Sequence, residues 1–447
     1  MTIGFRSAGR RAGLTGTAVL LVLAALTGCS GGSARPAEHA QVPGAASASG
    51  MPSGSGAASG SGAAGVSDGG APLRTSPCPV ALPASWQHAL DAGTLWHDAD
   101  DQLPAGLPVT TANGTGVLHQ QATPTSVRIS VLGTGRRELA TVGTLPIAAA
   151  EQGGISYASS DAHQLAFVYN LGTGEDQQNR WRLYLWDAGS GQLRVVATNP
   201  TGAGGTPVRG GWVHPLLAGG HLYWIQATPS VAGHPGLSPG SELRQYDLAT
   251  GRTRTLYSGL TQSYLVYGDT VFFTALAGSG APNPDGTPPL VLRAVVARTG
   301  APAPVPAGLD AARDRPDFMV TDGDLVVWDT SDGGLRGWRP SWQRTVTLFP
   351  DLQQQRPAAL ADLGQPAMPR IYGHFLVWSD RQTYLLDLRT DSFVRLTPNH
   401  GVEDLAGSRL AMWQYATDGR PAAPGHLTGT AYLLDLAALP GLPGCGG

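Results

Sequence analysis

Four aspartates recur at the same place in a repeated pattern, and carboxylates are among the side chains most used for acid–base chemistry. Asp187, Asp247, Asp387 and Asp435 each follow a short apolar run that contains a tyrosine. Gly-containing turns follow Asp187 and Asp247, so these carboxylates are well placed to accept N–H groups of the next turn. A repeat needs one such residue per unit, whereas a catalytic centre needs one or two unique groups. The pattern predicts structural turn aspartates, and we assign no catalytic residue from it.

A second group of acids lies close together in the chain, at Asp322, Asp324, Asp329 and Asp332. Calcium sites use oxygen ligands at turn spacing, but these acids do not follow the order of a calcium-binding loop. We therefore expect solvated turn acids, with a calcium site as the alternative. The histidines are scattered singly and no phosphate-binding loop is present, so we expect no metal and no cofactor.

The N-terminal segment has the composition of an export signal. Arg6, Arg10 and Arg11 precede an apolar run at residues 18–26, which is too short to span a membrane. The run ends in Leu-Thr-Gly-Cys, which resembles a bacterial lipobox. The resemblance implies a signal peptide at residues 1–28, cleavage before Cys29 and a lipid on the Cys29 thiol. The alternative is an ordinary secreted protein.

Residues 29–76 are rich in Gly, Ala and Ser and bury too little apolar surface to fold, so we expect a disordered tether. Removing residues 1–28 takes away three arginines and no acid, which changes the formal net charge from −3 to −6. An acidic chain argues against nucleic-acid binding. Membrane attachment would therefore come from the lipid alone, on the extracytoplasmic face of the cell membrane.

The remaining residues, 77–447, are predicted to form one all-β domain. Short apolar runs separated by Gly-containing turns recur along the chain, and we interpret seven of them as the third strands of four-stranded blades. They lie at residues 127–131, 184–187, 244–248, 292–296, 335–338, 384–388 and 432–436. A β-propeller of seven blades follows, although six or eight also fit the spacing. Residues 83–92 are the one stretch predicted to be helical, with Ser85 as its N-cap.

Two cysteines remain beside Cys29, one at each end of the predicted domain. In an oxidising exported compartment, Cys78 and Cys445 are expected to form a disulfide; the alternative is two free thiols. Because a propeller brings its first and last strands together, this bond would lock the ring near its termini.

The signal, the tether and repeats of the form G-x-L-x-x-W…Y-x-x-D-L over residues 116–439 resemble bacterial exported β-propellers, of TolB-like and quinoprotein-like type, particularly propeller lipoproteins of actinobacteria. The resemblance is specific for fold and implies no activity. We expect a monomeric module that binds or scaffolds an envelope protein or glycan. The alternative is an exported hydrolase, lyase or quinoprotein-type enzyme with its site in the central funnel. Four loops rich in Gly and Pro are the predicted binding segments, at residues 172–179, 229–241, 277–289 and 414–429.

Overall fold

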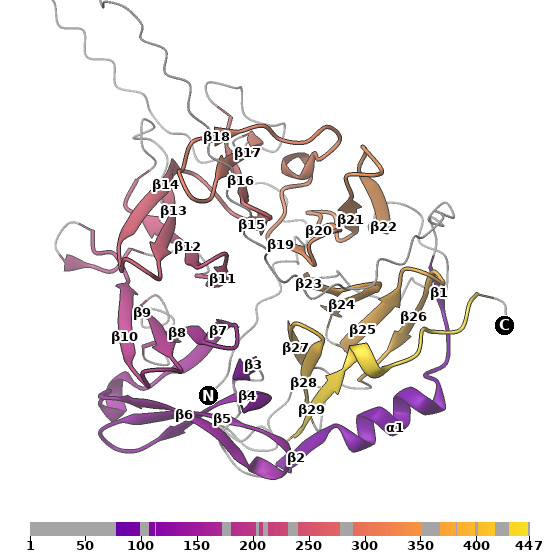
Figure 1. Ribbon diagram of the computed structural model, residues 1–447, viewed down its shortest axis with the longest axis horizontal. Coiled ribbons are helices and arrows are strands. Elements are labelled where there is room, and N and C mark those ends of the chain that lie inside the picture. Colours follow the sequence, from indigo (N-terminus) through magenta and orange to yellow (C-terminus); the bar gives the residue numbers. More distant parts are fainter. Residues whose placement is uncertain are drawn as a thin grey trace, which may run out of the picture. The chain divides into compact units, whose positions relative to one another are not determined.

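The protein is a seven-bladed β-propeller (Figure 1). The computed structural model describes residues 77–98, 107–111, 113–171, 180–202, 205–208, 213–230, 240–277, 289–350, 367–380, 382–397, 401–415 and 429–445. The predicted signal peptide, the predicted tether and Cys29 lie outside these residues. No helix within the described part of the chain is long and apolar enough to cross a membrane.

Each blade is an antiparallel sheet whose strands follow one another from the ring centre outward. Blade 1 contains β3 (Pro108–Thr111), β4 (Gly114–Ala122), β5 (Val127–Leu132) and β6 (Glu138–Leu145). Blade 2 contains β7 (Gly154–Ser160), β8 (Gln164–Asn170), β9 (Trp181–Asp187) and β10 (Leu193–Thr198). Blade 3 contains β11 (Leu216–Ala218), β12 (His221–Thr228), β13 (Gly240–Asp247) and β14 (Thr253–Gly259).

The next three blades repeat this order. Blade 4 contains β15 (Tyr264–Tyr267), β16 (Thr270–Leu276), β17 (Leu290–Val296) and β18 (Pro302–Ala303). Blade 5 contains β19 (Met319–Thr321), β20 (Val326–Asp329), β21 (Leu335–Trp338) and β22 (Val346–Phe349). Blade 6 contains β23 (Ala367–Tyr372), β24 (Phe375–Asp380), β25 (Gln382–Asp387) and β26 (Ser392–Arg395). All seven predicted third strands are therefore third strands in the structure, and the prediction of seven four-stranded blades is confirmed.

Blade 7 shows how the ring closes. Its first three strands, β27 (Gly401–Ala406), β28 (Arg409–Tyr415) and β29 (Gly429–Asp435), come from the end of the chain. Its outermost strand is β2 (Thr94–Asp98), which comes from the beginning and pairs antiparallel with β29. Backbone hydrogen bonds between the two ends of the chain therefore complete the last sheet.

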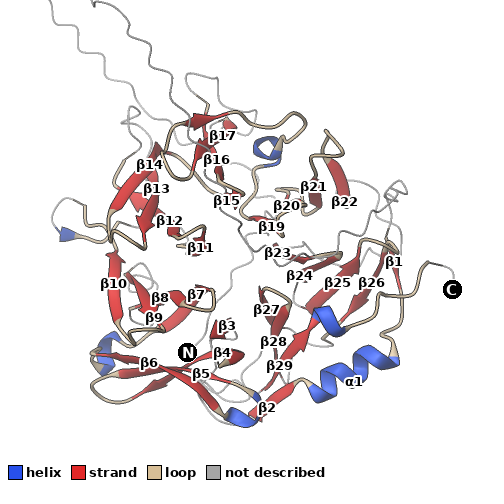
Figure 2. Cartoon of the chain, in the orientation of Figure 1, coloured by secondary structure: helices blue, strands red, loops and turns tan. Residues whose placement is uncertain are grey.

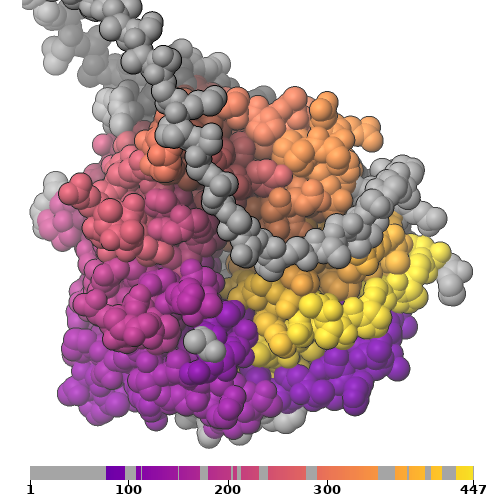
Figure 3. All heavy atoms as spheres, viewed as in Figure 1, coloured from indigo at the N-terminus to yellow at the C-terminus, as the bar shows by residue number. Residues whose placement is uncertain are grey.

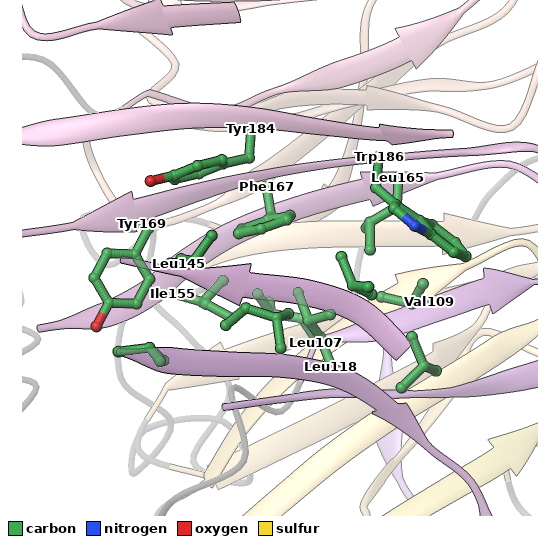
Figure 4. Packing of buried hydrophobic residues seen from close by; sticks show 14 of the residues in the cluster. Leu107, Val109, Leu118, Leu145, Ile155, Leu165, Phe167, Tyr169, Tyr184 and Trp186 are labelled. Atoms are coloured by element: carbon green, nitrogen blue, oxygen red, sulfur yellow. The ribbon is translucent and has the colours of Figure 1, made fainter. Parts of the chain in front are cut away.

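Many of the inner strands, such as β8 and β20 among the second strands and β25 among the third, are buried on both faces because neighbouring blades stack against them. Their sequences are nearly continuous apolar runs, which is typical of strands in sheets that are covered on both faces. Phe167 of β8 and Tyr184 of β9 stack within blade 2 with ring centroids 5.2 Å apart, and both belong to a core cluster that also contains Val109 and Leu118 of blade 1 (Figure 4). Burying a side chain such as Phe167 contributes roughly 1.5–3 kcal/mol, so this packing holds consecutive blades together.

The described residues contain one α-helix, α1 (Ala84–Ala92). It lies on the outer rim beside blades 6 and 7 (Figure 2). Short 3-10 turns occur at Thr134–Arg136, Ala149–Glu151, Ala311–Asp314 and Leu436–Ala438. The N-cap of α1 is Pro83, and no side chain caps it. The prediction of Ser85 as N-cap is wrong, because the extended backbone of Pro83 already starts the helix and Ser85 falls within its first turn.

The N-terminal segment also reaches blade 6. Strand β1 (Cys78–Pro79) pairs parallel with β26 as a fifth strand. Trp86 of α1 is fully buried and packs edge-on against Phe375, with ring centroids 5.4 Å apart. The N-terminal segment and the C-terminal tail lie against each other along the rim (Figure 3). The indole Nε1 of Trp86 donates to the carbonyl of Pro440 at 3.1 Å.

The predicted disulfide is present between Cys78 and Cys445, whose positions are 367 residues apart in sequence. One further contact fixes the tail: the backbone N–H of Leu442 donates to Oδ2 of Asp387 at 2.8 Å. A Cβ at Gly441 would lie 2.9 Å from the same oxygen, so glycine allows the close approach. The tail is thus held to blade 6 by one covalent bond and one buried carboxylate.

We predict that Asp387→Ala destabilises the protein more than Asp247→Ala. Asp387 is fully buried and accepts from the N–H groups of Leu442 and Arg389, whereas the cap that Asp247 makes is exposed. Leaving the buried donors unpaired should lower the free energy of unfolding by about 2–4 kcal/mol. Urea denaturation of both variants measures the difference, and equal losses would show that the tail contact contributes nothing.

Candidate functional site

The first strands of the seven blades surround the centre of the ring. Because each sheet is antiparallel, the first strands begin on the face where the second strands end, which we call the start face. The opposite face, where first strands turn into second strands, is the turn face. The four predicted binding loops follow second strands, so their ends lie on the start face. Nearly all of their residues lie outside the described part of the chain.

Three aromatic rings meet at the ring centre. Tyr157 lies in β7, while His214 and Phe318 lie just before β11 and β19. The ring centroids of Tyr157 and His214 are 3.7 Å apart, and those of His214 and Phe318 are 4.8 Å apart in an edge-to-face arrangement. The residues belong to blades 2, 3 and 5, so the contact between His214 and Phe318 joins blades that are not neighbours.

An ion pair lies beside these rings. Nε of Arg370, in β23, is 2.6 Å from Oδ1 of Asp404, in β27. The same carboxylate oxygen accepts the backbone N–H of Leu405 at 2.9 Å. Arg370 also donates through Nη1 to the carbonyls of Met368 and Pro369, at 3.2 and 3.1 Å. The guanidinium is therefore held in one orientation between blades 6 and 7.

We call Tyr157, His214, Phe318, Arg370 and Asp404 the ring-centre cluster. The charge of Arg370 acts on both His214 and Tyr157, and that of Asp404 acts on Tyr157. The five side chains, from five different blades, therefore share one environment. None of them repeats from blade to blade, unlike the turn aspartates.

Burial fixes the protonation states of the cluster. Desolvation, assisted by the positive charge of Arg370, lowers the pKa of His214 to about 3. Desolvation also raises the pKa of Tyr157 well above its ordinary value. At neutral pH both side chains are uncharged, and Arg370 and Asp404 balance each other. The cluster is polar but carries no net charge.

Some of its hydrogen-bonding atoms have no partner among the residues that the structure describes. Among the described residues, none donates to or accepts from the imidazole nitrogens of His214, and none bonds Oδ2 of Asp404. Both residues are largely enclosed, yet each keeps a small exposed surface. A neutral imidazole offers one donor and one acceptor, and a carboxylate oxygen offers an acceptor. These atoms are available to a molecule bound at the ring centre.

Hydrogen bonds between neighbouring first strands hold the cluster in place. The backbone N–H of Thr110 donates to Oγ of Ser160, and that of Leu217 donates to Oγ of Ser159, each at 2.9 Å. The hydroxyl of Tyr264 donates to the carbonyl of His214 and, at 3.0 Å, to that of Tyr223. The backbone of His214 is therefore tied to blade 4 as well as to its own blade.

The buried carboxylate of Asp329 holds the backbone of Phe318 in place. Oδ1 of Asp329 accepts the backbone N–H of Phe318 at 2.9 Å. Burial, the largest effect, raises the pKa of Asp329 to about 7, and the negative charge of Asp317 adds to it. The expectation of a solvated turn acid is therefore wrong for Asp329, because it ends strand β20 inside the sheet. Asp322 does cap a turn, through the N–H groups of Asp324 and Leu325 at 3.0 and 2.9 Å.

The predicted turn aspartates lie on the turn face, away from the cluster. Oδ1 of Asp187 accepts the N–H of Ser190 at 2.7 Å, and Oδ1 of Asp247 accepts that of Thr250 at 2.8 Å. These N–H groups hold the pKa of both carboxyls below its ordinary value. Oδ1 of Asp435 accepts from Oγ of Ser408 at 2.7 Å. The structure does not bring these residues together, so they form no common site.

Sequence reasoning found no member of the ring-centre cluster. Each is a single residue on or beside a first strand, and some of these strands are short, such as β11 and β19 with three residues each. The one available signal was a polar or aromatic residue that breaks the apolar run, such as Arg370 beside Ile371. No group of three or more His, Cys, Asp or Glu residues that would hold a metal occurs in the part of the chain that the structure describes.

Comparison with known proteins gives likenesses of fold. No family model and no curated protein matches the sequence. Among solved structures, the β-propeller domain of the trilobed protease from Pyrococcus furiosus is similar at 8% identity and a TM-score of 0.44, over 74% of this chain and 93% of that one. The computationally designed Ika8 protein is similar at 10% identity and a TM-score of 0.36, over 75% of this chain and 100% of that one. Hydrazine synthase of Kuenenia stuttgartiensis is similar at 10% identity and a TM-score of 0.38, over 66% and 80%. We draw no functional argument from them.

We predict that His214→Gln removes part of the acid sensitivity of the fold. The folded-state pKa of His214 is about 3, below its ordinary value of 6.5, so the unfolded chain binds the proton more readily. The stability that neutral His214 contributes is present above pH 6.5 and is lost as the pH falls towards 3. The wild type should therefore lose on the order of 3 kcal/mol more than the variant between pH 7 and pH 4. Denaturation at the two pH values tests this, and parallel curves would contradict it.

Proposed function

We propose that this protein is a lipid-tethered binding module on the extracytoplasmic face of the cell envelope. It binds the exposed part of an envelope protein or glycan at the ring-centre cluster, from the start face. The propeller acts as a rigid frame, and the tether lets that face turn towards its partner.

One observation carries the proposal: five unrepeated side chains from five blades meet at one place. Repeated residues maintain the architecture of a propeller, and these five depart from the repeat. Convergent polar groups beside aromatic rings are typical of ligand sites. The imidazole nitrogens of His214 and Oδ2 of Asp404, to which no described residue bonds, give such a site its direct contacts.

The proposed localisation at the cell envelope is inferred from the sequence. The basic residues, the short apolar run and the small-residue-Cys sequence at Cys29 are in the order of a lipoprotein signal. The disulfide between Cys78 and Cys445 is consistent with an oxidising compartment. The likeness of the repeats to exported propeller lipoproteins supports the same address.

The chemistry of the cluster favours binding over catalysis. A general acid or base works best when its pKa lies near the working pH. The pKa of His214 is about 3 and that of Tyr157 is raised above its ordinary value, so neither exchanges protons readily at neutral pH. Asp329 has a pKa of about 7, but it is buried and its Oδ1 accepts the N–H of Phe318. An exported enzyme is therefore the weaker alternative.

Site-specific cross-linking in intact cells tests the proposal. A photo-reactive benzoylphenylalanine replaces Phe318 in the full chain, and the matched control carries it at the exposed His163 on the turn face. We expect a recurrent covalent adduct with one envelope protein or glycan from position 318 and none from position 163. Mass spectrometry of the purified adducts gives the readout.

Two outcomes would count against the proposal. The same adducts from both positions, or none from position 318 in a chain that melts like the wild type, would remove the ring centre as the binding site. The variant Cys29→Ala separately tests the tether. It should move from the membrane fraction to the soluble fraction, and retention in the membrane would contradict the lipid anchor.

A further inference from the structure

The hydrogen-bonding atoms of the cluster that no described residue satisfies indicate the kind of ligand that fits the ring centre. We propose that the ring-centre cluster binds a neutral saccharide residue, such as the exposed end of an envelope glycan. This inference rests on the proposed function and narrows it to one class of ligand. It follows from three properties of the cluster: its hydrogen-bonding atoms, its charge and its aromatic surfaces.

The hydrogen-bonding atoms match hydroxyl groups. His214 presents one donor and one acceptor nitrogen, and Oδ2 of Asp404 presents an acceptor. A hydroxyl group both donates and accepts, so vicinal hydroxyls of a sugar ring can satisfy the imidazole and the carboxylate together. Hydrogen bonds to a charged carboxylate are stronger than those between neutral groups, which makes Asp404 the main polar contact.

The charge of the cluster selects a neutral ligand. Nε of Arg370 lies 2.6 Å from Oδ1 of Asp404, so the positive charge is compensated before any ligand arrives. A phosphate or sulfate would meet that carboxylate at close range, and like charges repel. Since burial holds His214 in its neutral form, the imidazole adds no positive charge to attract an anion.

The aromatic surfaces provide the apolar part of the site. Tyr157 and Phe318 flank His214 and are themselves only partly buried. Aromatic faces carry partial negative charge and attract the partially positive hydrogens of C–H groups. A pyranose ring has such C–H groups on its faces and hydroxyls at its edge. One sugar residue can thus contact the rings and the polar atoms at once.

Binding of simple sugars to the purified full chain tests the inference. The probes are glucose, galactose, mannose and N-acetylglucosamine, with glucuronic acid and glucose 6-phosphate as charged counterparts. Saturation-transfer NMR detects binding and titration calorimetry measures it. We expect at least one neutral sugar to bind, and its charged counterpart to bind more weakly.

Two variants and a control locate the site. His214→Phe keeps an aromatic ring but removes both nitrogens, and should weaken binding roughly 10- to 100-fold. Asp404→Asn leaves the charge of Arg370 uncompensated, so it should weaken neutral sugars and improve the binding of glucuronic acid. It also serves as the independent test if His214→Phe fails to fold. The control His163→Phe, on the turn face, should bind like the wild type.

The outcomes separate this inference from the proposed function. Absence of neutral-sugar binding together with a recurrent protein adduct at position 318 would overturn the saccharide inference and leave the binding module standing. Absence of both would overturn both proposals. Sugar binding that is unchanged in His214→Phe and Asp404→Asn would place the sugar elsewhere and overturn the assignment to the cluster.

Discussion

The pairing of β2 with β29 is the contact on which the rest of the structure depends. Seven blades in an open row would leave one apolar face of the first blade and one of the last blade uncovered, and the row would have no common centre. The N-terminal strand completes blade 7, and the segment before it adds β1 to blade 6. The disulfide to Cys445 and the bond from Leu442 to Asp387 then hold the C-terminal tail over the same two blades. Closure is therefore distributed over three kinds of interaction.

Closure also creates the chemistry of the centre. His214 and Phe318 belong to non-adjacent blades, and the circular arrangement of the blades brings their side chains into contact at the centre. Within that enclosure, desolvation keeps His214 and Tyr157 neutral, and the compensated pair of Arg370 and Asp404 keeps the whole cluster without net charge. Side chains in these protonation states are poor proton donors and acceptors in catalysis. They are well suited to hydrogen bonding with a neutral partner.

The repeated strands of the blades could be predicted from the sequence, whereas the residues and strands that do not repeat could not. Third strands such as β25 were found because burial between blades gives most of them an apolar run, and four of the seven end in an aspartate. Strand β2 was missed because five residues with no repeat partner give no signal until they pair with β29. The cluster was missed because His214 and Phe318 are about a hundred residues apart and meet only when the blades are arranged around a common centre. Asp329 was misjudged because its neighbours in sequence are turn acids, while its own position is inside a strand.

The protonation of His214 tests the account most directly, because it reports both ring closure and the neutral character of the centre. Nitrogen–proton correlation NMR of the histidine side chains, on the full chain and with His214→Gln for assignment, distinguishes neutral from protonated imidazole. At pH 5.5 an ordinary histidine is mostly protonated. The account predicts that His214 remains neutral at this pH, since its pKa lies at about 3. A His214 signal that shows protonation at pH 5.5 would mean that the ring does not enclose the cluster, and would contradict the account.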